Sequence, residues 1–302
     1  HLPQMRGYDV VQVTNPVFFD LRPEKNWAIF KYLKKHNKKI FLDALAIDHY
    51  YVKACLDGKT FRYSDFFVGD RPLPHPEREK MLAAWIGGPN ERPNIEMAQE
   101  ANGIIACLYE YYAAYQPEYA DKLAYIPIPI DLSINPFHPI KSTPEVVKFF
   151  IGIQQHRTAI KGTDILLDVL REIHDKYPRE SHIQKVVSVP FNEYNKLLVD
   201  CHILLDQLYS YTPATNALAA MARGIIAVSG AEPEFYNFIG EQKLRPIINV
   251  LPDRNDIFKQ LENLIIHRDQ LPRLSTESRQ FVEKYHDHVK VARQYLEFWE
   301  KH

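Results

Sequence analysis

The sequence predicts an α/β protein made of two doubly wound domains, each with a largely parallel sheet. Segments typical of strands and of helices alternate along the chain, which favours parallel sheets over hairpins. The alternation restarts after residues 131–143, which contain prolines and polar residues without periodicity, as a linker does. The length of 302 residues also suits two domains of ordinary size.

The first domain is expected over residues 1–135. Its strands are expected at Asp9–Thr14, Lys39–Ile47 and Gly103–Cys107, followed by an extended, proline-containing segment at Tyr125–Ile130. Pro23 opens a helix predicted over Glu24–Asn37, with Trp27, Phe30 and Leu33 on one face. The polar, proline-rich residues 65–93 predict an irregular insertion or lid, after which Asn94 is expected to cap a helix that begins at Ile95.

The start of this domain differs from the usual pattern. A doubly wound domain generally begins with a strand, a glycine-rich turn and a helix. Only eight residues precede Asp9, and none of them supplies such a turn. We therefore expect the first domain to be incomplete, without its initial strand-turn-helix unit.

The second domain is expected over residues 136–275. Its strands are expected at Val146–Ile151, Val186–Val189, Ile203–Leu205, Ile225–Val228 and Ile247–Val250. Thr163 is expected to cap a helix with an apolar stripe formed by Ile165, Leu166, Val169, Leu170 and Ile173. Residues 276–302 predict a C-terminal helix with the stripe Val289, Ala292, Leu296 and Trp299, one option being that it packs back on the first domain.

Composition and charge exclude several classes of function. The formal net charge of -1 gives no basic face for nucleic acid. The three cysteines are few and far apart, which indicates reduced thiols in the cytoplasm. No apolar run approaches the roughly 18 residues of a membrane span. The basic run Lys31, Lys34, Lys35, Lys38 and Lys39 predicts a solvated helix face, with peripheral contact at the inner face of the membrane as the alternative.

Two cations follow the first strand of the second domain. That strand ends at Gly152, and Arg157 and Lys161 lie in the loop before the next helix. Ligands of open α/β sheets bind at this carboxyl edge, where Arg and Lys suit a diphosphate. The alternative is a solvated loop with ordinary surface charges.

A second anion site is predicted at the turn Tyr209–Ala214, which leads into an alanine-rich helix. Ala214, Thr215 and Asn216 lie where the first helical N–H groups are unpaired, and such a terminus attracts phosphate. The alternative is that Thr215 or Asn216 only caps the helix.

These segments together resemble a known family. The string G-x4-R-x3-K-G from Gly152, followed by N-A-L-A-A-M-A-R-G-I-I-A-V-S-G-x-x-E, resembles the retaining GT-B glycosyltransferases of family four, which build bacterial polysaccharides. The resemblance implies two Rossmann-like domains facing one cleft, a nucleotide-sugar donor held by the second domain, and a glycan or lipid-linked acceptor. It also implies that no metal or other cofactor is needed, and the chain contains no Asp-x-Asp string.

The resemblance assigns further residues. Arg157 and Lys161 would hold the diphosphate, the turn Ala214–Asn216 would add N–H groups, and Val189, Pro190 and Phe191 would lie beside the base. Glu234 matches the acidic residue that follows the family's glycine-rich turn. The family's two glutamates, eight residues apart, are replaced here by Tyr211 and Ala219. Asn216 or the Tyr211 hydroxyl is expected to substitute in part, and Glu232 or Glu234 to supply charge.

In the first domain, Asp48 and His49 end the strand Lys39–Ile47 and are candidates to orient the acceptor hydroxyl, with Glu234 as the third candidate catalytic group. The alternative is that Asp48 caps the next helix and His49 packs. The cluster His286-Asp287-His288 predicts a solvated face, because helical spacing separates residues i and i+2.

Glycosyl transfer is thus the function that the sequence favours. Two alternatives remain: a non-catalytic protein of this fold that binds nucleotide or glycan, and a nucleotide-sugar epimerase.

Overall fold

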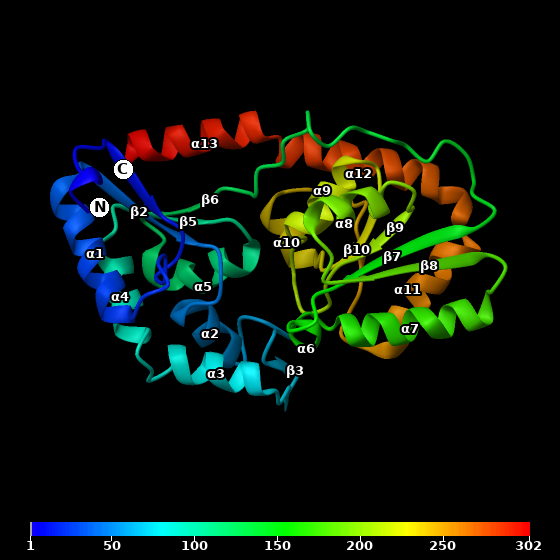
Figure 1. Ribbon diagram of the computed structural model, residues 1–302, viewed down its shortest axis with the longest axis horizontal. Helices are drawn as coiled ribbons and strands as arrows, with labels where there is room; N and C mark the ends of the chain where they lie inside the picture. Colours follow the sequence, from blue (N-terminus) through cyan, green and yellow to red (C-terminus); the bar gives the residue numbers. More distant parts are fainter. Residues whose placement is uncertain (1) are drawn as a thin grey trace. The chain divides into compact units, whose positions relative to one another are not determined.

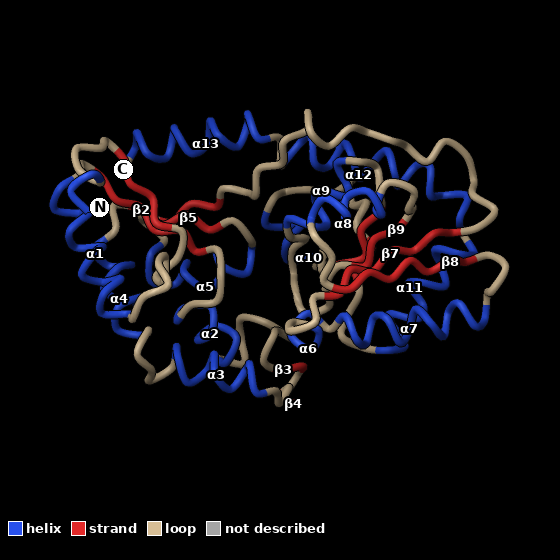
Figure 2. Tube along the Cα trace, in the orientation of Figure 1, coloured by secondary structure: helices blue, strands red, loops and turns tan. Residues whose placement is uncertain are grey.

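The computed structural model describes residues 2–302, which divide into two compact units. Unit 1 comprises residues up to Pro127 together with Val291–His302, and unit 2 comprises Ile128–Lys290. Both are α/β layers with parallel sheets, as the alternating pattern predicts (Figures 1 and 2).

Unit 1 contains a four-stranded parallel sheet in the order β1-β2-β5-β6. The strands are β1 (Val10–Val13), β2 (Lys39–Ala44), β5 (Gly103–Ala106) and β6 (Leu123–Tyr125). The helices are α1 (Pro23–His36), α2 (His49–Leu56), α3 (Pro76–Trp85), α4 (Glu91–Glu100) and α5 (Tyr109–Tyr119). A short 3-10 turn spans Leu2–Gln4, and the hairpin strands β3 (Phe67–Val68) and β4 (Arg71–Pro72) pair with each other.

Two expectations for this unit are wrong. Residues 65–93 are not irregular, because they contain the hairpin β3–β4 and helix α3, in which Arg78 and Trp85 are buried. Asn94 does not cap a helix but lies inside α4, fully buried, where its side-chain oxygen accepts a hydrogen bond from the His49 backbone at 2.9 Å. In α1, Phe30 and Leu33 are buried as predicted, whereas Asn26 replaces Trp27 as the third buried side chain.

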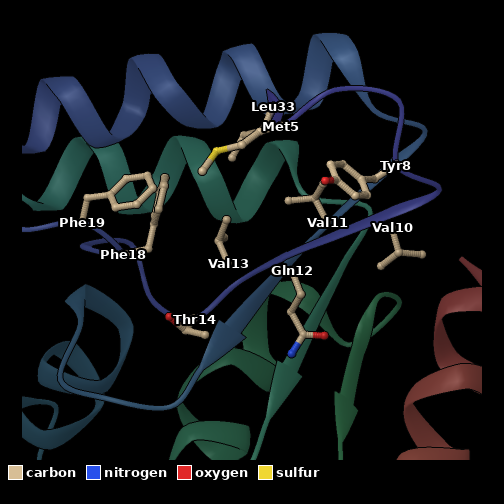
Figure 3. Close-up of a pocket in the computed structure, with 10 residues that line it drawn as sticks. All are labelled: Met5, Tyr8, Val10, Val11, Gln12, Val13, Thr14, Phe18, Phe19 and Leu33. Atoms are coloured by element: carbon tan, nitrogen blue, oxygen red, sulfur yellow. The ribbon is translucent and has the colours of Figure 1, made fainter. Parts of the chain in front are cut away.

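The edge strand β1 borders an apolar cavity of about 400 Å³ (Figure 3). Val11 and Val13 point into it from β1, and Phe18 and Leu33 close it from the loop after β1 and from α1. Gln12 also lines the cavity, although its side-chain amide is directed toward the opposite face of the sheet (Figure 3).

The face of the unit 1 sheet that Gln12 shares is covered by helix α13 (His288–Lys301). Phe41 and Ile105 of the sheet pack against Val291 and Phe298 of this helix. The Trp299 indole donates a hydrogen bond to the Gln12 side chain at 3.1 Å. The C-terminal segment is therefore part of the unit 1 core.

The predicted C-terminal helix is in fact two helices, α12 (Leu271–Tyr285) and α13. The break falls at the 286–287 pair, where Ile130 and Asp287 form an isolated bridge. The predicted apolar stripe is only partly correct, because Val289 and Leu296 are 56% and 55% exposed, whereas Trp299 packs against the core. Val291 and Phe298 are the buried side chains of α13.

Unit 2 contains a five-stranded parallel sheet in the order β11-β10-β9-β7-β8. Its strands are β7 (Val147–Ile153), β8 (Ser181–Val187), β9 (Ile203–Leu205), β10 (Ile226–Ser229) and β11 (Ile248–Asn249). Its helices are α6 (Thr158–Lys161), α7 (Thr163–Lys176), α8 (Phe191–Leu198), α9 (Thr215–Ala222), α10 (Pro233–Phe238), α11 (Arg254–Ile266) and α12, with a 3-10 turn at Arg268–Gln270. Helices α7 and α11 cover one face of the sheet, and α8, α9 and α12 cover the other (Figure 1).

The stripe predicted for α7 is largely confirmed, since Leu166, Val169, Leu170 and Ile173 are buried there. Thr163 is not its cap, however. Gly162, with a φ of 67°, is both the C-cap of α6 and the N-cap of α7.

Candidate anion-binding site of unit 2

The strand order of unit 2 changes direction at β7. The chain passes from β7 to its neighbour β8 on one side and then crosses to β9 on the other side. The crossover helices leave in opposite directions here, so the carboxyl ends of β7 and β9 border the crevice where doubly wound sheets bind ligands. The loops after these two strands therefore form the candidate site.

The loop after β7 carries the two predicted cations. Arg157 is exposed and precedes the short helix α6, and Lys161 is the half-exposed last residue of that helix. No acidic side chain of residues 2–302 forms an ion pair with either of them. Both charges are therefore unneutralised by short contacts.

Gly162 joins this loop closely to the loop after β9. A side chain at Gly162 would place its Cβ 2.7 Å from Leu208 Cβ and 3.1 Å from the Tyr209 ring, and its φ of 67° also favours glycine. The Leu208 backbone N–H donates to the Lys161 carbonyl at 2.9 Å. These contacts fix the end of α6 against the β9 loop.

Asp206 is a site residue that the sequence interpretation missed. It follows β9 directly, is 3% exposed, and its backbone N–H donates to the Val228 carbonyl at 3.0 Å. Its Oδ1 accepts a hydrogen bond from the Asn216 amide at 3.0 Å, and its Oδ2 is buried with no hydrogen-bond partner among residues 2–302. Burial raises the pKa of Asp206, while the Lys161 charge and the Asn216 hydrogen bond lower it.

Helix α9 begins beside Asp206. Its N-cap is Ala214, which is extended, and neither Thr215 nor Asn216 caps the helix through its side chain. The capping alternative is therefore wrong, and the first N–H groups have no intrahelical partner. Thr215 is exposed, and the Asn216 amide donates one hydrogen bond to Asp206.

Gly152 has a packing explanation. A Cβ at this position would lie 2.6 Å from Cε2 of Tyr194, whose ring packs edge-on against Phe150 with 5.0 Å between centroids. Burial raises the pKa of Tyr194 to about 12. The glycine therefore makes room for an aromatic ring of the same unit.

The predicted base-side segment follows β8. Val189 packs on the core cluster around Phe150, and Pro190 is the N-cap of α8. Phe191 is 76% exposed. Of the three, only the Phe191 ring has a large apolar surface open to a ligand.

The acidic pair at the start of α10 is split between two environments. Glu232 is 2% exposed and accepts a hydrogen bond from the Asn249 amide at 3.0 Å, while its backbone N–H donates to the Tyr211 carbonyl at 3.1 Å. Glu234 is half-buried in the first helical turn. Tyr211 is 2% exposed, so its side chain is buried.

In unit 1, Asp48 and His49 have structural roles. Asp48 is fully buried and caps α2 by accepting from the Tyr51 backbone at 2.9 Å, and it also accepts from the Tyr115 hydroxyl at 2.7 Å. Burial raises the pKa of Asp48 to about 6. His49 is 6% exposed, with Nδ1 3.0 Å from the Trp85 carbonyl oxygen. The interpretation of Asp48 as a helix cap and His49 as a packed histidine is confirmed.

The basic run forms a solvated face, as predicted, because Lys31, Lys34, Lys35 and Lys38 are exposed. Lys34 pairs with Glu100 and Lys38 with Asp9 on this surface, and the half-buried Lys39 donates to the Trp299 carbonyl at 2.6 Å. His286 is 2% exposed, so the prediction of a solvated face is wrong for this residue.

Comparison with known proteins supports the fold. No known family profile matches the chain, and no curated protein matches its sequence. Sucrose-phosphate synthase from Thermosynechococcus elongatus superposes with a TM-score of 0.61 at 14% identity, over 98% of this chain and 74% of that one. HepE from Anabaena, solved with UDP and glucose, gives 0.62 at 12% identity, over 100% and 80%. An S. aureus TarM mutant, solved with Fondaparinux, alpha-GlcNAc-glycerol and UDP, gives 0.60 at 13% identity, over 91% and 59%.

These structures are GT-B glycosyltransferases, and the likeness establishes the α/β fold with two parallel sheets that the sequence predicts. Among residues 2–302, no helix is both long and apolar enough to cross a membrane.

Proposed function

We propose that this protein is a glycosyltransferase that moves a sugar from a nucleotide-diphosphate donor to a glycan or lipid-linked acceptor. The observation that supports the proposal is the anion site of unit 2. Arg157, Lys161 and the N-terminus of α9 lie on the two loops that border the β7/β9 switch point. Two cations and a set of unpaired N–H groups suit a diphosphate.

The same groups suit the reaction. Glycosyl transfer from such a donor releases a nucleoside diphosphate, and negative charge grows on it as the sugar–oxygen bond breaks. Fixed cations and N–H groups stabilise that charge, and electrostatic stabilisation of this kind contributes several kcal/mol in many enzymes. Because the chain supplies these cations itself, the proposal includes no metal requirement. Retention of configuration, membership of family four and a role in bacterial surface polysaccharide synthesis complete the proposal, with Glu234 as the remaining candidate catalytic carboxylate.

Binding of UDP, GDP and ADP by calorimetry tests the site. Arg157→Ala and Lys161→Ala should each weaken binding of the preferred nucleotide about tenfold, since a charge-assisted hydrogen bond to phosphate contributes about 1.5 kcal/mol. Arg171→Ala is the matched control, because Arg171 is an exposed cation on α7 whose weak pair with Asp168 spans 3.3 Å. Unchanged affinity in both site variants would show that the diphosphate binds elsewhere.

A non-catalytic nucleotide- or glycan-binding protein is the second candidate, favoured by the replacement of the family glutamates with Tyr211 and Ala219. A radiolabelled-donor assay separates the two functions, because transfer to acceptor above a Lys161→Ala control requires an enzyme. Incubation of donor without acceptor identifies the third candidate, since an epimerase converts the donor alone.

A further inference from the structure

We propose that Asp206 is a positioning residue for the donor diphosphate, its buried carboxylate orienting the Lys161 ammonium by charge and the first turn of α9 through Asn216. The inference rests on the proposed function of the same site. It adds a residue that belongs to neither of the strings on which the family resemblance depends.

The first observation is that the Asp206 carboxylate is poorly compensated. It is 3% exposed and has one hydrogen-bond donor, the Asn216 amide at 3.0 Å. Its Oδ2 is buried without a hydrogen-bond partner among residues 2–302. A buried carboxylate in this state is costly unless a cation offsets its charge.

The second observation identifies that cation. Lys161 is the positive group whose charge acts on Asp206 and favours its ionised form. No acidic side chain among residues 2–302 forms a short ion pair with Lys161, so Asp206 acts on it through space rather than through a direct contact. The backbone bond from Leu208 to the Lys161 carbonyl, at 2.9 Å, keeps the two loops in this register.

The third observation concerns α9. Asn216 is the second residue of this helix, so the bond from its amide to Asp206 ties the helix start to the end of β9. One carboxylate thus contacts or attracts both parts of the anion site. A lysine side chain has several rotatable bonds, and a fixed negative charge on one side reduces the range of positions that its ammonium group occupies.

The alternative to positioning is that Asp206 repels the diphosphate. The two roles predict opposite changes in nucleotide affinity when Asp206 is removed. If Asp206 only contributed negative charge near the diphosphate, its removal would tighten nucleotide binding. If its charge positions Lys161, removal of that charge weakens nucleotide binding only while Lys161 is present. Asp206→Asn makes this change alone, because asparagine keeps a side-chain oxygen that can accept the hydrogen bond from the Asn216 amide.

A double-mutant cycle with UDP as the probe, measured by calorimetry at pH 8, tests the proposal. Asp206→Asn should weaken UDP binding at least about threefold, and should change it by less than about 1.5-fold when combined with Lys161→Met. Asp175→Asn, which removes an exposed carboxylate at the far end of α7, is the matched control and should leave affinity unchanged. Unchanged or tighter binding by Asp206→Asn, or an equal loss with and without Lys161, would overturn the proposal.

A second measurement uses an unaltered Asp206 and so does not depend on the folding of its variants. Carbon-13 NMR titration of the Asp206 carboxyl should give a higher pKa in Lys161→Met than in the wild type, and equal values would refute the coupling. The proposed function can be refuted separately, because it is wrong if Lys161→Met leaves UDP affinity unchanged. If Lys161→Met lowers UDP affinity but Asp206→Asn does not, only the role of Asp206 is contradicted.

Discussion

Gly230 offers a direct test of how the structure builds the start of α9. A Cβ at Gly230 would lie 1.7 Å from the Ser210 carbonyl oxygen and 2.3 Å from the Ser210 carbonyl carbon. To reach even 3.0 Å, the oxygen would have to retreat by 3.0 − 1.7 = 1.3 Å. The clash is with backbone, so no side-chain rotation relieves it, and the turn that leads to Ala214 has to move.

The expected cost follows from this displacement. Overpacking a tight core site costs typically 1–3 kcal/mol and occasionally more, and a clash with backbone belongs at about 3 kcal/mol. For a unit the size of unit 2, that predicts a fall in melting temperature of about 6–12 °C. Because the turn carries the first N–H groups of α9, Gly230→Ala should also weaken UDP binding.

Thermal unfolding followed by circular dichroism, together with UDP calorimetry, measures both effects. Gly240→Ala is the matched control, because Gly240 has a φ of 68° with nothing within 4 Å of its Cβ position and should lose only about 1–2 kcal/mol from backbone strain. If Gly230→Ala melts within about 1 °C of the wild type and binds UDP normally, the proposed packing of the Ser210 turn against β10 is incorrect.

Four further expectations follow from single features of the molecule. Burial lowers the pKa of His286 to about 4 from an ordinary 6.5, so between these pH values the unfolded chain binds a proton that the folded chain does not. The free energy of unfolding should therefore fall by about 3 kcal/mol more in the wild type than in His286→Gln when the pH is lowered from 7 to 4, as measured by urea unfolding. An equal fall in both proteins would argue against this. Phe191→Ala should weaken UDP binding about fivefold or more through lost stacking of the base, yet leave pyrophosphate binding and the melting temperature unchanged, because the ring is 76% exposed. Equal losses of affinity for UDP and pyrophosphate would show that the base does not bind beside Phe191. Chelation with EDTA should leave transferase activity within about 20% of its starting value, since Arg157 and Lys161 supply the positive charge, and recovery of a lost activity by a divalent cation would contradict this. UDP and its sugar conjugates should bind within about threefold of each other, because Tyr211 and Ala219 offer no carboxylate to the sugar, and a tenfold preference for a conjugate would point to a sugar contact elsewhere.

The sequence predicts most of the elements because their patterns are local. The strands of unit 2 lie where short apolar runs occur, and the stripe of α7 faces the core as its spacing requires. The errors arise where a distant contact decides the outcome. Asn94 has the composition of a helix cap, yet it is buried inside α4, because the His49 backbone and the Tyr115 hydroxyl are its partners.

The same distinction applies to the site. Arg157 and Lys161 could be predicted because their position after a strand places them at the carboxyl edge. Asp206 also follows a strand, but its role in the site depends on its burial and on its hydrogen bond with Asn216, ten residues away. A single aspartate after an apolar run has no distinctive spacing that would identify it in the sequence. The burial of Asp48 and Tyr211 is equally invisible in the sequence, because it depends on contacts with distant segments.

The packing of unit 2 predicts that nucleotide binding and sugar transfer depend on different residues. Three glycines, Gly152, Gly162 and Gly230, each allow a close contact at the carboxyl edge of the sheet: with Tyr194, with Leu208 and with Ser210. These contacts hold the loops after β7 and β9 in place without any help from a ligand. Such a preorganised edge favours anion binding because little ordering remains to be done when the ligand arrives. The chemistry at the sugar needs a group that faces the sugar, and of the acidic pair at α10 only Glu234 is not enclosed by the core. Loss of turnover with retained UDP binding in Glu234→Gln would separate these two functions, whereas a parallel loss of both would place Glu234 in the diphosphate site.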